Sequence, residues 1–189
     1  MKRSTVNAAI QKAQTIFAQH GWILPPAPRW DVTDFGLGNF EREGLLLINL
    51  AEEIEYCEKL MLAFQDQVTP AHYHKQKKED IIARFGDLAV QLWSVSPDAA
   101  TGPDAVVKIN GAEVSVPFGQ IVTIPAGQRI TLVPGVWHAF WSATPYCVIG
   151  EVSTANDDAN DNFFINPDIG RYAAIEEDEP ALLKLVSDQ

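Results

Sequence analysis

From Leu45 onward the chain consists mostly of short apolar segments separated by turn residues, and this pattern restricts the fold more than any other feature. The sequence AVVKINGAEVSV is the clearest example, because Asn110-Gly111 separates two alternating segments and matches a type I′ hairpin turn. A second pair of strands is expected in DIIARFGDLAVQLWSV, with its turn at Gly86-Asp87, and YCVIGEVS ends the series. Repeated short strands at this spacing predict a mainly β fold, a barrel or a sandwich.

The residues before this series follow a different pattern. Apolar residues recur at helical spacing over residues 3–20, where Ser4 or Thr5 can cap the helix and Gly21 ends it. The next stretch, LPPAPRWDVTDFGLGNF, is expected to form an extended loop because it contains paired prolines and two glycines. A short strand from Leu45 to Asn49 should follow.

The length of 189 residues suits a single domain. We expect an N-terminal helix and extended arm at 1–44, a β-barrel at 45–155, and a C-terminal tail at 156–189 that packs on the barrel, with short flanking helices. A helix and a long loop ahead of a small barrel often cover a neighbouring subunit, so we also expect a homodimer.

Composition excludes several classes of partner. The formal net charge of −11 argues against nucleic acid and anionic membranes, and leaves neutral or cationic small molecules as ligands. The apolar runs are too short to span a bilayer, and the start lacks the apolar region of a signal peptide. Cys57 and Cys147 make no disulfide framework, so free thiols in a reducing cytoplasm are expected.

Three of the four histidines point to a metal site. His72 and His74 alternate along an expected strand, so their side chains project from the same face. Glu79 follows five residues later, and His138 lies in a strand entered through a Pro-Gly turn. Imidazoles combined with a carboxylate suit manganese, iron, zinc, cobalt or nickel. As a pair on a polar stretch, His72 and His74 could instead be surface or structural histidines.

Glu151 is a candidate general base. A tight turn near Ala143-Thr144 would form a hairpin in which Glu151 lies on the same face as His138. A carboxylate beside a metal site that is not needed as a ligand is available for proton transfer. The alternative is a glutamate at the barrel rim that points to solvent.

Other polar and aromatic residues near these motifs could contact a substrate. Lys77 lies between two expected ligands, where its ammonium could hold a substrate oxygen or stabilise developing charge, although a lysine-rich run is usually a solvated face. Acidic residues in NDDANDN could bind sugar hydroxyls or form Asx turns, and the aromatic residues of WHAFW could line a sugar site or pack in the core. These two groups are Asp157, Asp158 and Asp161, and Trp137, Phe140 and Trp141.

The spacing of these residues resembles the cupin superfamily, in which two motifs supply His, His, Glu and His to one metal inside a small β-barrel. The chain has H-x-H-x4-E-x6-G from His72, followed by G-x5-P-x-G from Gly119. It departs from the pattern at Asp66, where the first motif usually begins with Gly. It departs again at Ile130, where a His would follow the first turn, and the Pro134-Gly135 turn supplies His138 instead.

A narrower resemblance rests on HYHKQKKEDI, PGVWHAFWS, GEVSTANDDANDNFF and IGRYAAIEEDEP, which together are similar to the D-lyxose isomerase family of cupin sugar isomerases. The resemblance implies a divalent metal, typically manganese, and interconversion of D-lyxose with D-xylulose and often of D-mannose with D-fructose. It also implies roles for individual residues. The implied metal ligands are His72, His74, Glu79 and His138, the implied catalytic residues are Glu151 and Lys77, and the implied substrate contacts are Lys77 and Asp161.

The expected reaction moves a proton between C1 and C2 of an unphosphorylated sugar through a metal-stabilised enediol, with Glu151 as the base; a hydride shift is the other route. A cupin Fe(II) dioxygenase and a non-enzymatic sugar- or metal-binding cupin are alternatives, because the superfamily alone does not fix a function. A cupin phosphosugar isomerase should show a cluster of phosphate-binding residues, whereas the arginines here are scattered along the chain.

Overall fold

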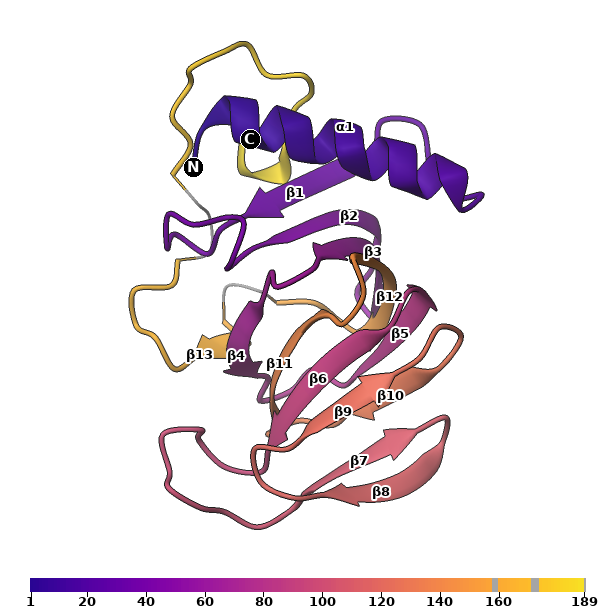
Figure 1. Cartoon of the computed structure of the whole chain (residues 1–189), viewed down its shortest axis with the longest axis vertical. Coiled ribbons are helices and arrows are strands. Elements are labelled where there is room, and N and C mark those ends of the chain that lie inside the picture. Colours follow the sequence, from indigo (N-terminus) through magenta and orange to yellow (C-terminus); the bar gives the residue numbers. More distant parts are fainter. Residues whose placement is uncertain (158–159, 171–173, 189) are drawn as a thin grey trace.

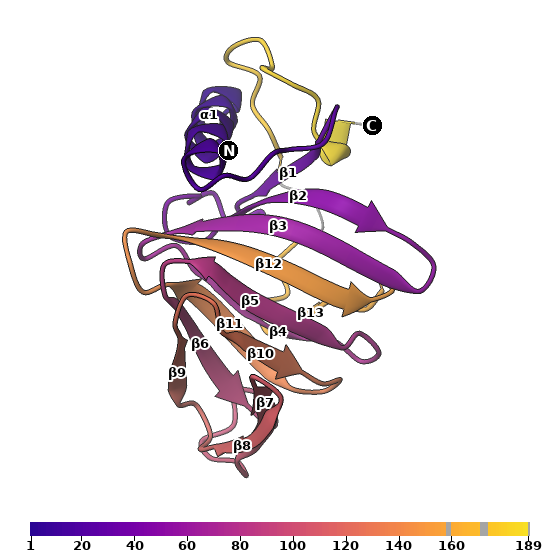
Figure 2. The same ribbon diagram turned by 90° about the vertical axis from the view of Figure 1, so that its right-hand side faces the viewer.

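The protein folds as two antiparallel β-sheets with an α-helix against the larger one (Figures 1 and 2). The computed structural model describes residues 1–157, 160–170 and 174–188. The predicted mainly β fold, a cupin-type barrel with an N-terminal helix, is confirmed. The helix α1 runs over Arg3–Gln19, and the expected flanking helices are represented in the described residues by one 3-10 turn, η1 at Val186–Asp188.

The larger sheet has eight strands in the described part of the chain, and they follow one another down the view in Figure 2. In spatial order they are β1 (Arg29–Thr33), β2 (Leu45–Glu52), β3 (Tyr56–Phe64), β12 (Tyr146–Thr154), β5 (Glu79–Phe85), β10 (Arg129–Leu132), β7 (Ala105–Ile109) and β8 (Ala112–Val116). The smaller sheet contains β13 (Phe163–Phe164), β4 (Thr69–Tyr73), β11 (Trp137–Ser142), β6 (Leu88–Trp93) and β9 (Ile121–Ile124).

The predicted hairpin turn at Asn110-Gly111 is confirmed. It joins β7 to β8, and both residues have positive φ, 50° for Asn110 and 86° for Gly111. A type I′ turn requires positive φ at both central positions, and this matches the right-handed twist of the flanking strands.

The hydrophobic core has two parts, one on each face of the larger sheet. The inner part fills the space between the two sheets and includes Met61, Ile81 and Phe140. The outer part lies under α1, where Ile10 and Phe17 pack against apolar side chains of β1, β2 and β3. Alternate residues of these three strands therefore face the helix, and the intervening residues face the interior of the barrel.

The stretch predicted as a loop contains a strand, so that prediction is wrong in part. β1 pairs antiparallel with β2, from Arg29 opposite Asn49 to Thr33 opposite Leu45. The prolines that suggested a loop all precede the strand. Burial of Trp30 against the helix supplies the apolar contact that fixes this edge strand.

The N-terminus of α1 is also capped differently from the prediction. The N-cap residue is Lys2, and it makes no side-chain capping hydrogen bond. Ser4 donates from its backbone N–H and its hydroxyl to the carboxylate of Asp178, at 2.9 and 2.7 Å. A residue from the C-terminal tail thus accepts from a free N–H of the first turn, where a negative charge is favourable.

The hairpin predicted between His138 and Glu151 is absent from the described sheets, because β11 and β12 lie in different ones. β11 pairs with β4 and β6, whereas β12 pairs with β3 and β5. β12 pairs with β3 along its whole length, and this long ladder outweighs a local hairpin. The turn after Ser142 therefore carries the chain from one sheet to the other.

In the described parts of the chain, no helix combines the length and the apolar character needed to cross a bilayer. Cys57 and Cys147 are both buried and free, as predicted, and burial raises the pKa of Cys57 to about 11 and that of Cys147 to about 12.

An ion cluster joins the two ends of the chain and gives a test of the fold. The buried guanidinium of Arg3 donates to Glu177 at 2.6 Å and to Asp188 at 2.8 Å. Burial alone would raise the pKa of Asp188, but hydrogen bonds from Arg3 and from the N–H of Leu185 hold that pKa below its usual value. A depressed carboxyl pKa stabilises the folded state above the unfolded pKa of about 3.9, and the contribution is lost as pH falls through the folded pKa.

Asp188→Asn should therefore lower the free energy of unfolding by roughly 1 kcal/mol at pH 7, and the difference from the wild type should shrink below about pH 4. Urea unfolding at several pH values measures it, with Asp98→Asn as an exposed control. An effect of the same size at pH 7 and at pH 3 would contradict the assignment.

Candidate metal and substrate site

Four side chains predicted as metal ligands meet between the two sheets. His72 on β4 is the direct cross-strand partner of His138 on β11, and His74 follows just beyond the end of β4. Glu79 is the first residue of β5 and reaches them from the larger sheet. All four are buried, and one ligand atom from each lies within 4.8 Å of the others.

A turn in the backbone holds the two histidine segments together. The N–H of Gly135 donates to the carbonyl of His74 at 2.8 Å. Gly135 has a φ of 87°, a region that residues with a Cβ rarely enter. The Pro134-Gly135 turn thus connects the segment after β4 to the start of β11, and it leads directly to His138.

Backbone carbonyls fix the protonation of the three rings. The Nδ1 atom of each histidine lies within hydrogen-bonding distance of a carbonyl oxygen, which can only accept, so each Nδ1 must carry the proton. The pairs are His72 with Pro70 at 2.8 Å, His74 with Asp161 at 2.5 Å, and His138 with Val136 at 3.1 Å. In each neutral ring the Nε2 atom is then an unprotonated acceptor.

The ligand atoms consequently form a cluster of acceptors. Nε2 of His138 lies 3.0 Å from Oε1 of Glu79, and Nε2 of His74 lies 3.7 Å from the same oxygen. All three of these atoms are buried without a hydrogen-bond partner among the described residues. Acceptors that face one another in a buried space need a cation between them. Three imidazoles and a carboxylate fit a divalent metal ion, and the group could hold one.

The electrostatics keep these groups in the forms that bind metal. Burial lowers the pKa of His72 and of His74, so both rings are neutral at neutral pH. Burial alone would raise the pKa of Glu79, but the Lys77 ammonium and the neighbouring histidines hold that pKa well below its usual value. Neutral imidazoles and an ionised carboxylate are the ligand forms that metals require.

A second charged group lies beside the first. The ammonium of Lys77 is 2.9 Å from Oε2 of Glu79 and 3.2 Å from Oε1 of Glu151. Lys59 on β3 approaches the same oxygen of Glu151 at 3.5 Å and donates to Asn156 at 3.1 Å. Glu151 and the two lysines are each less than 7% exposed. Buried charges are tolerated when they are paired in this way.

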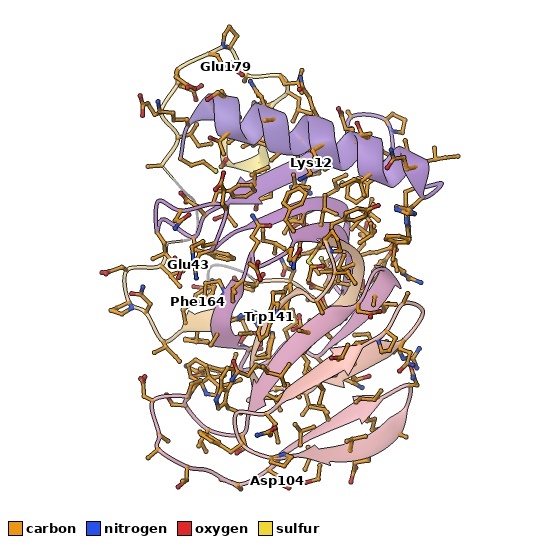
Figure 3. All side chains as sticks on the ribbon, viewed as in Figure 1. Lys12, Glu43, Asp104, Trp141, Phe164 and Glu179 are labelled. Atoms are coloured by element: carbon orange, nitrogen blue, oxygen red, sulfur yellow. The ribbon has the colours of Figure 1, made fainter. Side chains whose placement is uncertain are left out.

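Residues of both groups line one cavity of about 220 Å³, namely all of them except His138 and Asn156. Its walls include apolar residues of the larger sheet, such as Leu47 and Met61, together with Phe140 of β11. Residues of the C-terminal segment also contribute, among them Phe164, which Figure 3 shows beside β4. The ring of Phe164 lies 5.3 Å from the ring of His72. The cavity thus combines polar groups with apolar walls, as small-molecule sites do.

The other residues that the sequence suggested as substrate contacts lie in different surroundings. The carboxylate of Asp161 accepts hydrogen bonds from the backbone of residues 75–77, and the contact with a sugar expected of it stays a prediction. Asp157 is exposed, and its carboxylate accepts from the backbone N–H of Asn160, three residues further on, so it stabilises the local turn. Asp158 lies outside the described residues. Trp137 contacts the ring of Tyr73 at 4.5 Å.

Sequence reasoning missed Lys59. On β3 it alternates with Cys57, Met61 and Ala63, which are buried on the inner face of the sheet. A lysine at an inward position of an apolar strand is the signal that could have identified it, because lysine is almost never fully buried without a partner.

The chain is similar to known sugar isomerases over its whole length. A family model described as D-lyxose isomerase matches residues 27–189. A protein named D-lyxose/D-mannose isomerase from Escherichia coli O157:H7 is 36% identical, over 100% of this chain and 98% of that protein. A D-lyxose ketol-isomerase from Cohnella laeviribosi is 30% identical, over 95% of this chain and 100% of that protein.

A solved structure shares the fold. The L-ribose isomerase from Cellulomonas parahominis, determined with L-ribose, has a TM-score of 0.70, covering 93% of this chain and 98% of that one. The sequence identity is 18%, so this likeness concerns the fold alone.

The acceptor cluster predicts metal binding that depends on the site histidines. His74→Ala should weaken Mn²⁺ binding by more than roughly 100-fold, because even residues that only support a ligand cost 10–100-fold. Equilibrium dialysis with metal analysis measures this. His20→Ala is the matched control, because His20 contacts Tyr146 and Phe85 rather than the cluster. Equal metal uptake by wild type and His74→Ala would contradict the site.

Proposed function

The chain belongs to the D-lyxose isomerase family of aldose–ketose isomerases, and from this premise we propose that it interconverts D-lyxose with D-xylulose and D-mannose with D-fructose. The names of its relatives support the choice of substrates. The cavity of about 220 Å³ is smaller than the roughly 300–1,000 Å³ of pockets for drug-sized ligands, which suits a single monosaccharide.

One observation carries the proposal: a cluster of metal-binding acceptors and a buried carboxylate–ammonium pair share a single cavity. The first group consists of Glu79 and the three histidines, of which His72 and His74 line the cavity, and the second of Glu151 and Lys77. Aldose–ketose isomerisation needs both, because a proton must leave one carbon and reach the next while negative charge develops on the sugar oxygens.

Glu151 is assigned the proton transfer between carbons. Its carboxylate would take the proton from C2 of the aldose and return it to C1, while the proton of the O2 hydroxyl passes to O1, and the two transfers together give the ketose. Glu151 comes from the larger sheet and is paired in register with Lys59 on β3 and Ile81 on β5. A base held on the middle of a sheet is fixed in position, and fixed geometry is what proton transfer requires.

Lys77 is assigned to the sugar oxygens. Its ammonium lies between Glu79 and Glu151, so it can donate to a substrate oxygen from a point adjacent to both groups. An ammonium in this buried position would stabilise the negative charge that develops on the oxygen as the carbon loses its proton. It would also orient the Glu151 carboxylate through the 3.2 Å contact.

We assign His72, His74, Glu79 and His138 to a divalent ion, with Mn²⁺ as the proposed metal, since mixed nitrogen and oxygen ligands suit it. When bound, such an ion supplies Lewis-acid polarisation of the sugar's carbonyl and hydroxyl oxygens. We further propose a homodimer in the cytoplasm; two free thiols agree with a reducing compartment.

The alternatives assign a different role to the second charged group. An Fe(II) dioxygenase could use the same ligand set, but its chemistry has no use for a buried base held between two lysines. A non-enzymatic binding protein would need Glu151 for binding alone. The effect of Glu151 on turnover therefore separates the isomerase from both.

Glu151→Gln should lower kcat for D-lyxose by roughly 10²–10⁴-fold while bound Mn²⁺ stays at the wild-type level, because the amide cannot accept the proton. Ketose formation and metal content measure the two effects. Glu113→Gln, at an exposed position of β8, is the control. Unaltered turnover in Glu151→Gln would remove Glu151 as the base.

Proton transfer through a base also predicts exchange with solvent. Isomerisation of D-lyxose in D₂O should place deuterium at C1 of the ketose, since a proton held on Glu151 can exchange with water before it returns. Mass spectrometry and NMR of the product measure this. A product that forms at the normal rate without deuterium would favour a hydride shift.

A further inference from the structure

We propose that Asp161 is a positioning residue that acts on both groups of the site at once, through its carboxylate on Lys77 and through its backbone carbonyl on His74. The inference rests on the proposed function, because it assigns those two residues to the reaction. It concerns a residue that sequence reasoning had assigned to the sugar instead.

The carboxylate of Asp161 holds the backbone that carries Lys77. Oδ1 accepts from the N–H groups of Lys75 at 2.7 Å and Gln76 at 3.0 Å. Oδ2 accepts from Gln76 at 3.2 Å and Lys77 at 2.8 Å. Asp161 is 5% exposed, so these charge-assisted hydrogen bonds are shielded from water. They fix the backbone from which the Lys77 side chain extends toward Glu79 and Glu151.

The backbone carbonyl of Asp161 fixes a metal ligand. It accepts from Nδ1 of His74 at 2.5 Å, which places the proton on Nδ1 and leaves Nε2 facing Glu79. The carbonyl and the carboxylate belong to one residue, so anchoring of the carboxylate to residues 75–77 also holds the carbonyl against the ring.

The segment around Asp161 has other contacts that keep it in place. Phe163 and Phe164 form β13, which pairs with β4 at Tyr73 and His72. The ammonium of Lys75 lies 4.1 Å from the ring centroid of Phe163. Loss of the Asp161 carboxylate should therefore change the backbone of residues 75–77 locally, while β13 stays paired.

The geometry of the carboxylate favours this role over contact with the sugar. Both of its oxygens already accept hydrogen bonds from main-chain N–H groups. Asp161 is also not among the residues that line the cavity, whereas its neighbour Asn162 is.

The test is Asp161→Asn, which replaces one acceptor oxygen with an NH₂ group that cannot accept from the backbone N–H groups. The Mn²⁺ dissociation constant should rise roughly 10–100-fold, as for other residues that support a metal ligand. At saturating Mn²⁺, kcat should fall by roughly 10-fold or more while KM for D-lyxose stays nearly unchanged. Hydrogen exchange of the amides of residues 75–77 should become faster.

Asp168→Asn is the matched control, because Asp168 is an exposed residue of the same segment and the chemical change is identical. All four measurements should remain at wild-type values in this variant. Calorimetric titration gives the Mn²⁺ constant and mass spectrometry gives the exchange, so two of the readouts do not depend on turnover.

Two results would overturn the inference. A raised KM with an unchanged Mn²⁺ constant and unchanged exchange would show that Asp161 contacts the sugar. A lower Tm with wild-type values of the Mn²⁺ constant and kcat in the folded protein would show a structural role alone. If Asp161→Asn does not fold, Asp161→Glu, which keeps the charge but displaces it by one methylene, should show the same pattern, and wild-type values there would also overturn it.

Failure of the proposed function is a separate result. In that case the wild type would not isomerise D-lyxose, while the Mn²⁺ constant and the amide exchange of Asp161→Asn would still decide the positioning role.

Discussion

Each of the three site histidines donates its Nδ1–H to a backbone carbonyl, and the site depends on these bonds. The accepting carbonyls belong to Pro70, Val136 and Asp161, which lie in three separate segments of the chain. All three segments must be in place before the Nε2 atoms face Glu79. The site is therefore complete only when β4, the turn before β11 and the segment around β13 have come together, which agrees with a single domain, as proposed for residues 1–189.

The sequence was sufficient to name the four side chains that meet as candidate metal ligands, because local rules place the histidines. The i, i+2 spacing at the end of β4 places His72 and His74 on the same side, and the Pro134-Gly135 turn leads into β11, where His138 is the second residue. Local rules also explain one departure from the cupin pattern. Asp66 stands where the motif usually has Gly, and its φ is 60°, in the left-handed region. Asp tolerates this region better than most residues other than Gly.

What could not be predicted depends on contacts between distant segments. Glu151 reaches the site as expected, but from the opposite sheet, because nine residues of β12 pair with β3 rather than with the nearby β11. β1 was missed because its pairing with β2 and its burial against α1 are contacts with other segments, which the neighbouring prolines and glycines do not indicate. The capping of α1 by Asp178 and the contacts of Asp161 likewise join residues far apart in sequence, so no local pattern indicates them.

The charges around the cavity explain why the two groups are useful only together. Among the described residues that line it, the formal charges are those of Asp31, Glu79 and Glu151 against those of Lys59 and Lys77. Their sum is negative by one unit, which would oppose the build-up of negative charge on a sugar. A divalent ion would make the sum positive by one unit and reverse that effect. The lysines then need only to balance the carboxylates, and this pairing is what allows Glu151 to be buried beside the metal-binding group.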